Sequence, residues 1–99
     1  FQSKLNILKL QLKLKRYAQV PDQLIALREK VYNNYQLAIY YNYMGLLNER
    51  KGEFYLARKN YEQAVRLNEM RYIKVLVDFY ERMDLPYKAL EMLKRIGSH

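Results

Sequence analysis

Two runs of apolar residues at helical spacing, separated by a short break at Lys51-Gly52, constrain the fold of this chain more than any other feature. In the second run the apolar residues recur every three or four positions, as on one face of a helix: Phe54, Ala57, Tyr61, Ala64 and Val65. Gly52 can adopt the left-handed conformation that ends a helix, and Glu53 suits the positive end of the next one. A break this short predicts two antiparallel helices, an αα-hairpin.

A glycine in the middle of the first run predicts close helix packing. Gly45 costs about 1 kcal/mol relative to Ala inside a helix, so we expect a packing reason for it. The small residues Gly45 and Ala57 predict that the two helices approach each other closely at these positions.

The same hairpin resembles a known repeat family. Its order of aromatic, large apolar and Gly residues, followed by Ala, aromatic and Ala, is similar to the tetratricopeptide (TPR) signature. The matching residues are Tyr41, Met44, Gly45, Ala57, Tyr61 and Ala64. Two positions depart from the signature, because Asn48 stands where Tyr is usual and Glu69 where the closing Pro is usual.

A second copy of this frame begins 32 residues later, at Ile73 in place of Tyr41. Its positions are Ile73, Leu76, Val77, Tyr80, Ala89, Leu93 and Ile96. Because the usual TPR period is about 34 residues, we expect a tight turn near Asn68-Glu69. The resemblance covers residues 38–96. It implies an all-α fold, a TPR-like right-handed superhelix of antiparallel helix hairpins with about six helices.

Residues 4–18 carry two competing patterns. Four leucines alternate with polar residues as in a strand: Leu8, Leu10, Leu12 and Leu14. Against a strand, Leu, Lys and Gln favour helices and β-branched residues are nearly absent, so we expect a helix.

Turn residues divide the rest of the chain. Pro21 and Asp22 suit the first turn of a second helix, Asn33-Asn34 breaks the pattern, and Pro86 begins a last helix. The sequence therefore predicts three hairpins in one domain over residues 4–96. The first pair is either a divergent repeat or an N-terminal capping pair.

Composition excludes several classes of protein. With 51% hydrophobic residues the chain is not a disordered tail, and without cysteine it has neither disulfides nor thiolate metal sites. No apolar run reaches the roughly 20 residues of a membrane span and no signal peptide is visible, so we expect a cytoplasmic protein. Residues 1–3 resemble a cleaved tag, and residues 97–99 resemble a linker to a histidine tag.

Catalytic motifs are absent from the sequence. There is no glycine-rich phosphate loop and no His/Cys ligand cluster, and the single histidine, His99, belongs to the expected tag. We therefore expect no enzyme activity, no cofactor and no metal site.

The resemblance also implies a binding surface. In TPR proteins the first helix of each pair lines a concave groove that holds an extended peptide or a partner helix. The implied groove residues are Ile39, Asn42, Leu46, Glu49, Arg50, Arg71, Lys74, Asp78, Glu81 and Arg82. Asn42 and Lys74 do not reproduce the carboxylate clamp of chaperone-binding TPRs. The expected function is a protein-interaction or scaffold module within a larger protein.

A net charge of +8 leaves other functions open. No acid precedes Asp22, and the basic residues before it include Lys9, Lys13, Lys15 and Arg16. This basic surface is either a solvated helix face or a site for nucleic acid or an acidic partner, although known reading motifs are absent. The alternatives are a helical sensor or oligomerisation segment of a bacterial transcription regulator or signalling protein, with this surface near nucleic acid, and a helical RNA-binding repeat.

Eleven tyrosines are the most unusual part of the composition. The frame places three in the core: Tyr41, Tyr61 and Tyr80. Five others either form a binding surface or pack against neighbouring repeats: Tyr40, Tyr43, Tyr55, Tyr72 and Tyr87. Repeat proteins without polar caps expose apolar ends, so we expect self-association through Tyr87, Leu90 and Leu93 or through the first helix.

Overall fold

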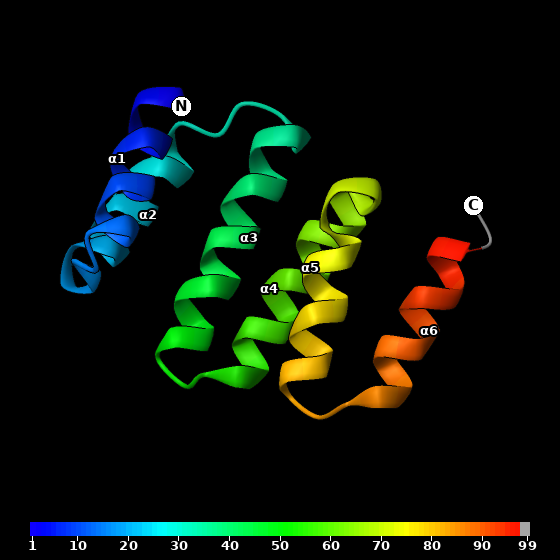
Figure 1. The fold of residues 1–99 in the computed structure, drawn as a ribbon. Coiled ribbons are helices and arrows are strands. Elements are labelled where there is room, and N and C mark those ends of the chain that lie inside the picture. The colour runs from blue at the N-terminus through cyan, green and yellow to red at the C-terminus, as the bar shows by residue number, and fades with distance from the viewer. Residues whose placement is uncertain (98–99) are drawn as a thin grey trace.

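Within residues 1–97 six α-helices follow one another (Figure 1). The computed structural model describes residues 1–97, with side chains for residues 1–95. The helices are α1 (Gln2–Lys13), α2 (Val20–Glu29), α3 (Asn34–Arg50), α4 (Phe54–Leu67), α5 (Glu69–Arg82) and α6 (Pro86–Gly97), and a short 3-10 helix, η1 (Tyr17–Gln19), leads into α2. Residues 1–97 contain no strand. The all-α prediction with six helices is confirmed, and the strand alternative for residues 8–14 is wrong.

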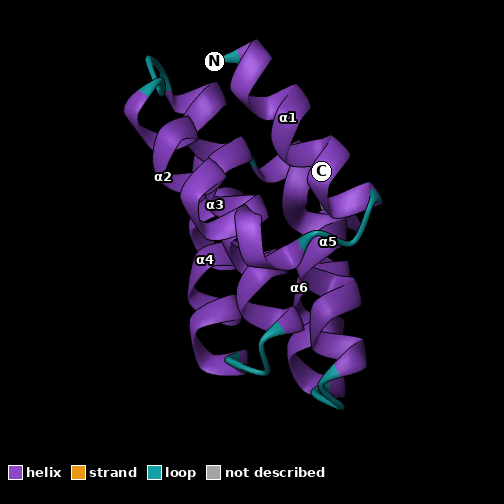
Figure 2. Cartoon of the chain, turned by 90° about the vertical axis from the view of Figure 1, so that its left-hand side faces the viewer, coloured by secondary structure: helices purple, strands orange, loops and turns teal. Residues whose placement is uncertain are grey.

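The helices form three hairpins, α1–α2, α3–α4 and α5–α6, which lie side by side in chain order (Figures 1 and 2). Each helix packs against the next one along the chain. The first hairpin lies at one edge of the molecule and α6 at the other, within overall dimensions of 36 × 28 × 19 Å. Since neighbouring helices in space are neighbours in sequence, short turns are enough to connect them.

The same cap ends the first helix of every hairpin. In each case the second residue after the helix has a left-handed backbone: Lys15 (φ 58°), Gly52 (φ 77°) and Asp84 (φ 57°). The next amide donates to a carbonyl five residues earlier, as Glu53 does to Asn48 at 2.8 Å, which is the Schellman motif. Gly52 and Asp84 are separated by the predicted period of 32 residues (84 − 52). The three hairpins thus share one turn geometry.

The predicted tight turn is confirmed at Asn68. This residue alone separates α4 from α5 and serves both as the C-cap of α4 and as the N-cap of α5. Asn48, the departure from the aromatic pattern, is buried. Its amide group accepts from Asn60 Nδ2 at 2.7 Å and donates to Glu53 Oε1 at 3.3 Å, so it ties α3 to the start of α4.

The core contains most positions of the repeat frame. In its second copy the buried members are Ile73, Leu76, Val77, Tyr80 and Ala89. Leu93 is half exposed because no further helix covers α6, and the side chain of Ile96 lies outside the described residues. In the first copy Tyr61 is buried as expected, whereas Tyr41 is only half-buried at the edge of the core.

The first helix differs from its prediction at both ends. It stops at Lys13 because Lys15 turns into the left-handed region, and Tyr17–Gln19 then forms η1. At its start, Gln2 and Ser3 belong to α1 and Phe1 packs against the core, so these residues are structurally part of the first hairpin. Residues 98–99 of the expected tag linker lie outside the described residues.

Gly45 has the packing reason that the sequence predicted, and the atoms nearest to it belong to Tyr61. A Cβ atom placed on Gly45 would lie 2.8 Å from Cδ1 of Tyr61. Ala57, the predicted partner, is fully buried one helical turn before Tyr61. The absence of a side chain at Gly45 therefore makes room for the Tyr61 ring.

Substitutions at the three caps are expected to change stability in opposite directions. Asp84→Gly should raise the free energy of unfolding by about 1 kcal/mol, because glycine adopts the left-handed conformation without steric cost. Gly52→Ala should lower it by about as much, since nothing lies within 4 Å of the added Cβ and backbone strain is the main cost. Urea unfolding measures both. Asp84→Ala is the control. A similar gain in the free energy of unfolding with alanine would show that removing the carboxylate, and not the freedom of the glycine backbone, causes the stabilisation.

Gly45→Ala is expected to destabilise the protein by about 1–3 kcal/mol, because the new methyl group overpacks against Tyr61. Alanine normally stabilises a helix interior by about 1 kcal/mol relative to glycine, so the sign of the change is diagnostic. In a Tyr61→Leu background the same substitution should cost much less. Thermal and urea unfolding of the original protein, the two single variants and the double variant complete the double-mutant cycle. A Gly45→Ala substitution that is neutral or stabilising would contradict the contact.

Candidate functional site

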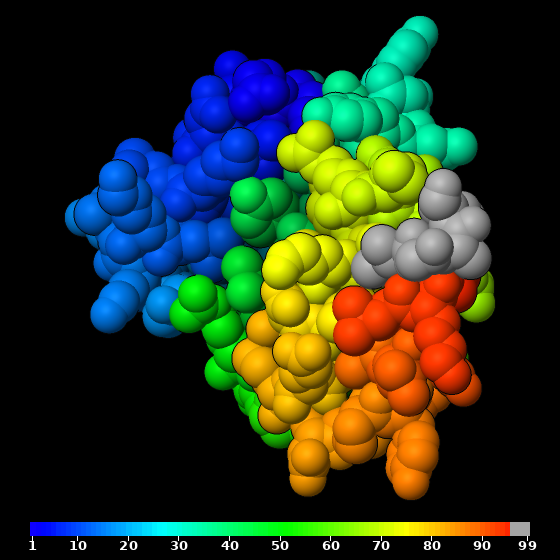
Figure 3. All heavy atoms as spheres, turned by 45° about the vertical axis from the view of Figure 1, so that its right-hand side comes forward, coloured from blue at the N-terminus to red at the C-terminus, as the bar shows by residue number. Residues whose placement is uncertain are grey.

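The first helices of the three hairpins, α1, α3 and α5, share one side of the molecule, here called the first-helix face. In Figure 3 the green atoms of α3 lie between the blue atoms of α1 and the yellow atoms of α5. A small hollow of about 90 Å³, the three-helix hollow, is lined by all three helices. The predicted groove residues, which belong to α3 and α5, are thus on helices that meet at one surface.

A hollow of about 430 Å³ opens between α3 and α5, and we call it the α3–α5 hollow. Its lining residues are Leu46, Glu49, Arg50 and Arg82, all of which were predicted for the groove. Glu49 and Arg82 form a two-pronged ion pair across it, with Arg82 Nε 2.7 Å from Oε2 and Nη2 2.8 Å from Oε1. The Tyr61 hydroxyl also donates to Glu49 Oε1, at 3.0 Å.

This network shifts the proton affinities of its members. The hydrogen bonds from Arg82, with a smaller contribution from the Tyr61 hydroxyl, lower the pKa of Glu49 below its usual range. Burial raises the pKa of Tyr61, and the negative charge of Glu49 raises it further. At neutral pH Glu49 is therefore ionised, while the Tyr61 hydroxyl stays protonated and donates the hydrogen bond between them.

The three-helix hollow contains three other predicted groove residues, Ile39, Asn42 and Arg71, together with Lys9 of the basic surface. Ile39 was predicted to contact a partner, but it is buried and belongs to the core, because α3 packs tightly between its neighbours. Asn42 Oδ1 is enclosed and has no hydrogen-bond partner among the described residues.

Three predicted groove residues line neither hollow: Lys74, Asp78 and Glu81. Lys74 and Glu81 are exposed on α5, and Asp78 is half-buried. The same helix face therefore continues as a charged surface beyond the hollows.

The predicted basic surface is solvent-exposed, and it consists of Lys9, Lys13, Lys15 and Arg16. None of the four forms an ion pair within residues 1–95. No acid precedes Asp22 in the sequence, so these residues have no local partner within the first helix.

Sequence reasoning missed a further hollow, the Tyr17 hollow, at the junction between the first hairpin and the end of α3. Its volume is about 480 Å³, and it is lined by Tyr17, Ala18, Pro21, Leu47, Arg50 and Lys51. Arg50 donates from Nη1 to the Tyr17 hydroxyl at 2.7 Å, and its guanidinium carbon lies 4.9 Å from the centre of that ring. Because these residues are 33 positions apart, no local pattern could have paired them.

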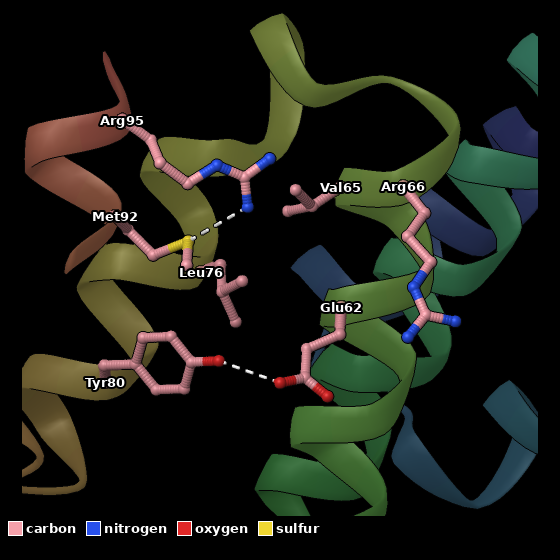
Figure 4. Close-up of a pocket in the computed structure, with 7 residues that line it drawn as sticks. All are labelled: Glu62, Val65, Arg66, Leu76, Tyr80, Met92 and Arg95. Carbon is pink, nitrogen blue, oxygen red and sulfur yellow. Dashed lines mark hydrogen bonds between the residues drawn. The ribbon is translucent and has the colours of Figure 1, made fainter. Parts of the chain in front are cut away.

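Helices α4 and α6 form a separate pocket of about 200 Å³ with α5, shown in Figure 4. The Tyr80 hydroxyl points to Glu62 and donates to its Oε2 at 2.9 Å, while Arg95 pairs with Glu69 at 2.9 Å. Burial, followed by the hydrogen bond to Glu62, raises the pKa of Tyr80. These contacts connect α4, α5 and α6 and give Glu62 and Arg95 partners within the structure, whereas Arg66 forms no ion pair within residues 1–95.

Apolar residues at the two ends of the stack are exposed, as the self-association hypothesis requires. On α6 these are Tyr87, Leu90 and Leu93, and on α1 they are Ile7 and Leu10. Among the other tyrosines Tyr55 is exposed and Tyr72 is buried, while Tyr40 and Tyr43 are half-buried. Only part of the tyrosine set is therefore available to a partner.

Neither a cluster of metal ligands within residues 1–97 nor a matching known protein points to a function. Within residues 1–97 no three His, Cys, Asp or Glu side chains gather as metal ligands, and no helix is long and apolar enough to cross a membrane. No protein-family model matches the chain, and no curated protein or solved structure is significantly similar to it.

The Glu49–Arg82 contact is expected to contribute a stabilisation that is lost at acidic pH. Because the folded-state pKa of Glu49 lies below its ordinary value of 4.5, the stabilisation is complete above that value and disappears as the pH falls through the lower folded pKa. At neutral pH Glu49→Gln should cost about 0.5–1 kcal/mol, as expected for a partly exposed pair. Urea unfolding of both proteins at neutral and strongly acidic pH measures the difference. A difference that persists unchanged in acid would contradict an ionic contribution.

Proposed function

We propose that this chain is a non-catalytic protein-interaction module of TPR type, which binds a polypeptide segment on the first-helix face. The α3–α5 hollow is the observation that carries the proposal. Four residues from two neighbouring hairpins line it, and all four are among those that the TPR resemblance implies for a groove.

The shared geometry of the hairpins supports a repeat architecture. Three equivalent Schellman caps end α1, α3 and α5, and the last two are separated by the period of the sequence frame. Stacking of equivalent hairpins brings equivalent helices to one side, which is how repeat proteins form extended binding surfaces.

The chemistry of this face suits a polypeptide. Leu46, which is half-buried at the α3–α5 hollow, offers an apolar contact. Charges of both signs occur on the face, with Glu49 and Glu81 beside the cations. A phosphate track would instead require lysine and arginine without interspersed acids.

Peptide display on the folded chain, followed by NMR mapping, tests this function. Backbone amide signals of α1, α3 and α5 should shift when a selected peptide binds. Leu46→Glu should weaken binding at least about tenfold, which corresponds to about 1.4 kcal/mol, since it places a charge in the hollow. Leu56→Glu is the matched control, because Leu56 is exposed on α4 and lines neither the three-helix, the α3–α5 nor the Tyr17 hollow.

The control should leave both the dissociation constant and the melting temperature nearly unchanged, as surface substitutions usually alter stability by about 0.5 kcal/mol or less. The proposal is wrong if no peptide is selected, or if the shifts map to α2, α4 and α6.

The exposed basic surface favours one alternative, a helical segment of a transcription regulator or signalling protein that lies near nucleic acid. Lys13, Lys15 and Arg16 are exposed and form no ion pair within residues 1–95. Binding to phosphates would weaken steeply as salt rises, whereas binding in an apolar groove would be much less sensitive.

A further inference from the structure

Two hollows meet at Arg50, which lines both the α3–α5 hollow and the Tyr17 hollow. In Figure 3 the blue atoms of the first hairpin lie beside the green atoms of α3, where this junction forms. Together the two hollows extend over the end of α3, from the first hairpin on one side to α5 on the other.

The charge around this junction is positive. Lys15 and Arg16 directly precede Tyr17 in the chain and are exposed, as is Arg50. None of these three cations has a carboxylate within ion-pair distance among residues 1–95. A polypeptide that approaches the junction therefore meets several cations whose charge is not neutralised locally.

The nearby acids do not offset this charge in full, because Glu49 and Glu53 each already have a cation. The exposed Asp22, beside Pro21 in the chain, is within residues 1–95 a single unpaired acid against three unpaired cations. Glu49 is held by Arg82 at 2.7 Å, and Glu53 lies 3.5 Å from Lys51. Acidic groups on a partner would supply the missing charge complementarity.

Arg50 is suited to recognise such a group. Its one side-chain hydrogen bond within residues 1–95 runs from Nη1 to the Tyr17 hydroxyl, which leaves further N–H donors of the guanidinium for a ligand. Arginine binds carboxylates through two parallel hydrogen bonds, and stacking on Tyr17 holds the guanidinium in place beforehand. The rest of the Tyr17 hollow is mostly apolar, with Ala18, Pro21 and Leu47 in its lining.

Nucleic acid fits this junction less well than a polypeptide. Base recognition by aromatic residues needs an open ring face, and Arg50 covers the Tyr17 ring at 4.9 Å. An apolar lining beside cations suits an acidic segment with apolar side chains.

We infer that the two hollows bind an acidic polypeptide segment, with one apolar side chain in the Tyr17 hollow and a neighbouring carboxylate that accepts hydrogen bonds from Arg50. This inference rests on the proposed function and names the chemistry of the partner.

The test uses a short fluorescent peptide in which leucines are spaced among glutamates, titrated with the whole chain and followed by anisotropy. Two matched peptides carry serine in place of leucine and lysine in place of glutamate. The glutamate–leucine peptide should bind, the serine peptide should bind at least about tenfold more weakly, and the lysine peptide should not bind. Arg50→Glu should weaken binding at least about tenfold, and Arg50→Gln should do so to a smaller extent.

Lys59→Glu is the control, because Lys59 is exposed on α4 and lines neither hollow, while the net charge changes equally. Circular dichroism of each variant verifies the fold. An equal loss of peptide affinity with Lys59→Glu would show that the effect depends only on the overall charge of the protein, and it would overturn the inference. So would tighter, strongly salt-dependent binding of a single-stranded RNA probe that Arg50→Glu abolishes.

The outcomes also separate this inference from the proposed function. If displayed peptides map to the first-helix face but are not acidic and do not respond to Arg50→Gln, the inference fails and the proposed function stands. If no peptide of any composition maps to that face, both fail.

Discussion

The Tyr61 side chain is the contact on which the arrangement of the central helices depends. Its ring packs where Gly45 has no side chain, which brings α4 close to α3. The ring also lies 5.2 Å from that of Phe79 on α5, centre to centre. Its hydroxyl donates to Glu49, which binds Arg82, so one residue links the second hairpin to the third through both apolar and polar contacts. Overpacking at Gly45 therefore disturbs more than one helix pair.

The same network shapes the first-helix face. Glu49 is held by Arg82 and Tyr61, so its charge is neutralised inside the structure. Arg50, the next residue in α3, turns to the first hairpin and contacts Tyr17 instead. Two adjacent residues thus connect α3 to different neighbours, and the hollows open where these connections leave room. A surface assembled from three hairpins in this way can recognise a segment longer than any one helix could contact.

Tyrosine performs two tasks in this chain. Tyr61 and Tyr80 are buried. The hydroxyl of each donates a hydrogen bond to a glutamate on the preceding helix, Glu49 and Glu62 respectively. Burial of a large ring provides apolar contact area, while the hydroxyl satisfies a carboxylate that would otherwise be costly near the core. Tyr17 lies at the surface and positions a cation. The high tyrosine content therefore reflects hairpin packing as well as the positioning of a charged side chain at the surface.

Periodicity and turn residues determined the six helices, the αα-hairpin at Gly52, the turn at Asn68 and the buried positions of the second frame, because each depends on residues close together in the chain. Four of the predicted groove residues also line one hollow. Only the tertiary structure decided that α1 stops before Lys15, since lysine carries no signal for a left-handed backbone. It likewise decided that Ile39 is buried and that Arg50 contacts Tyr17. These outcomes depend on side chains from different hairpins, and their pairing follows from how the hairpins stack.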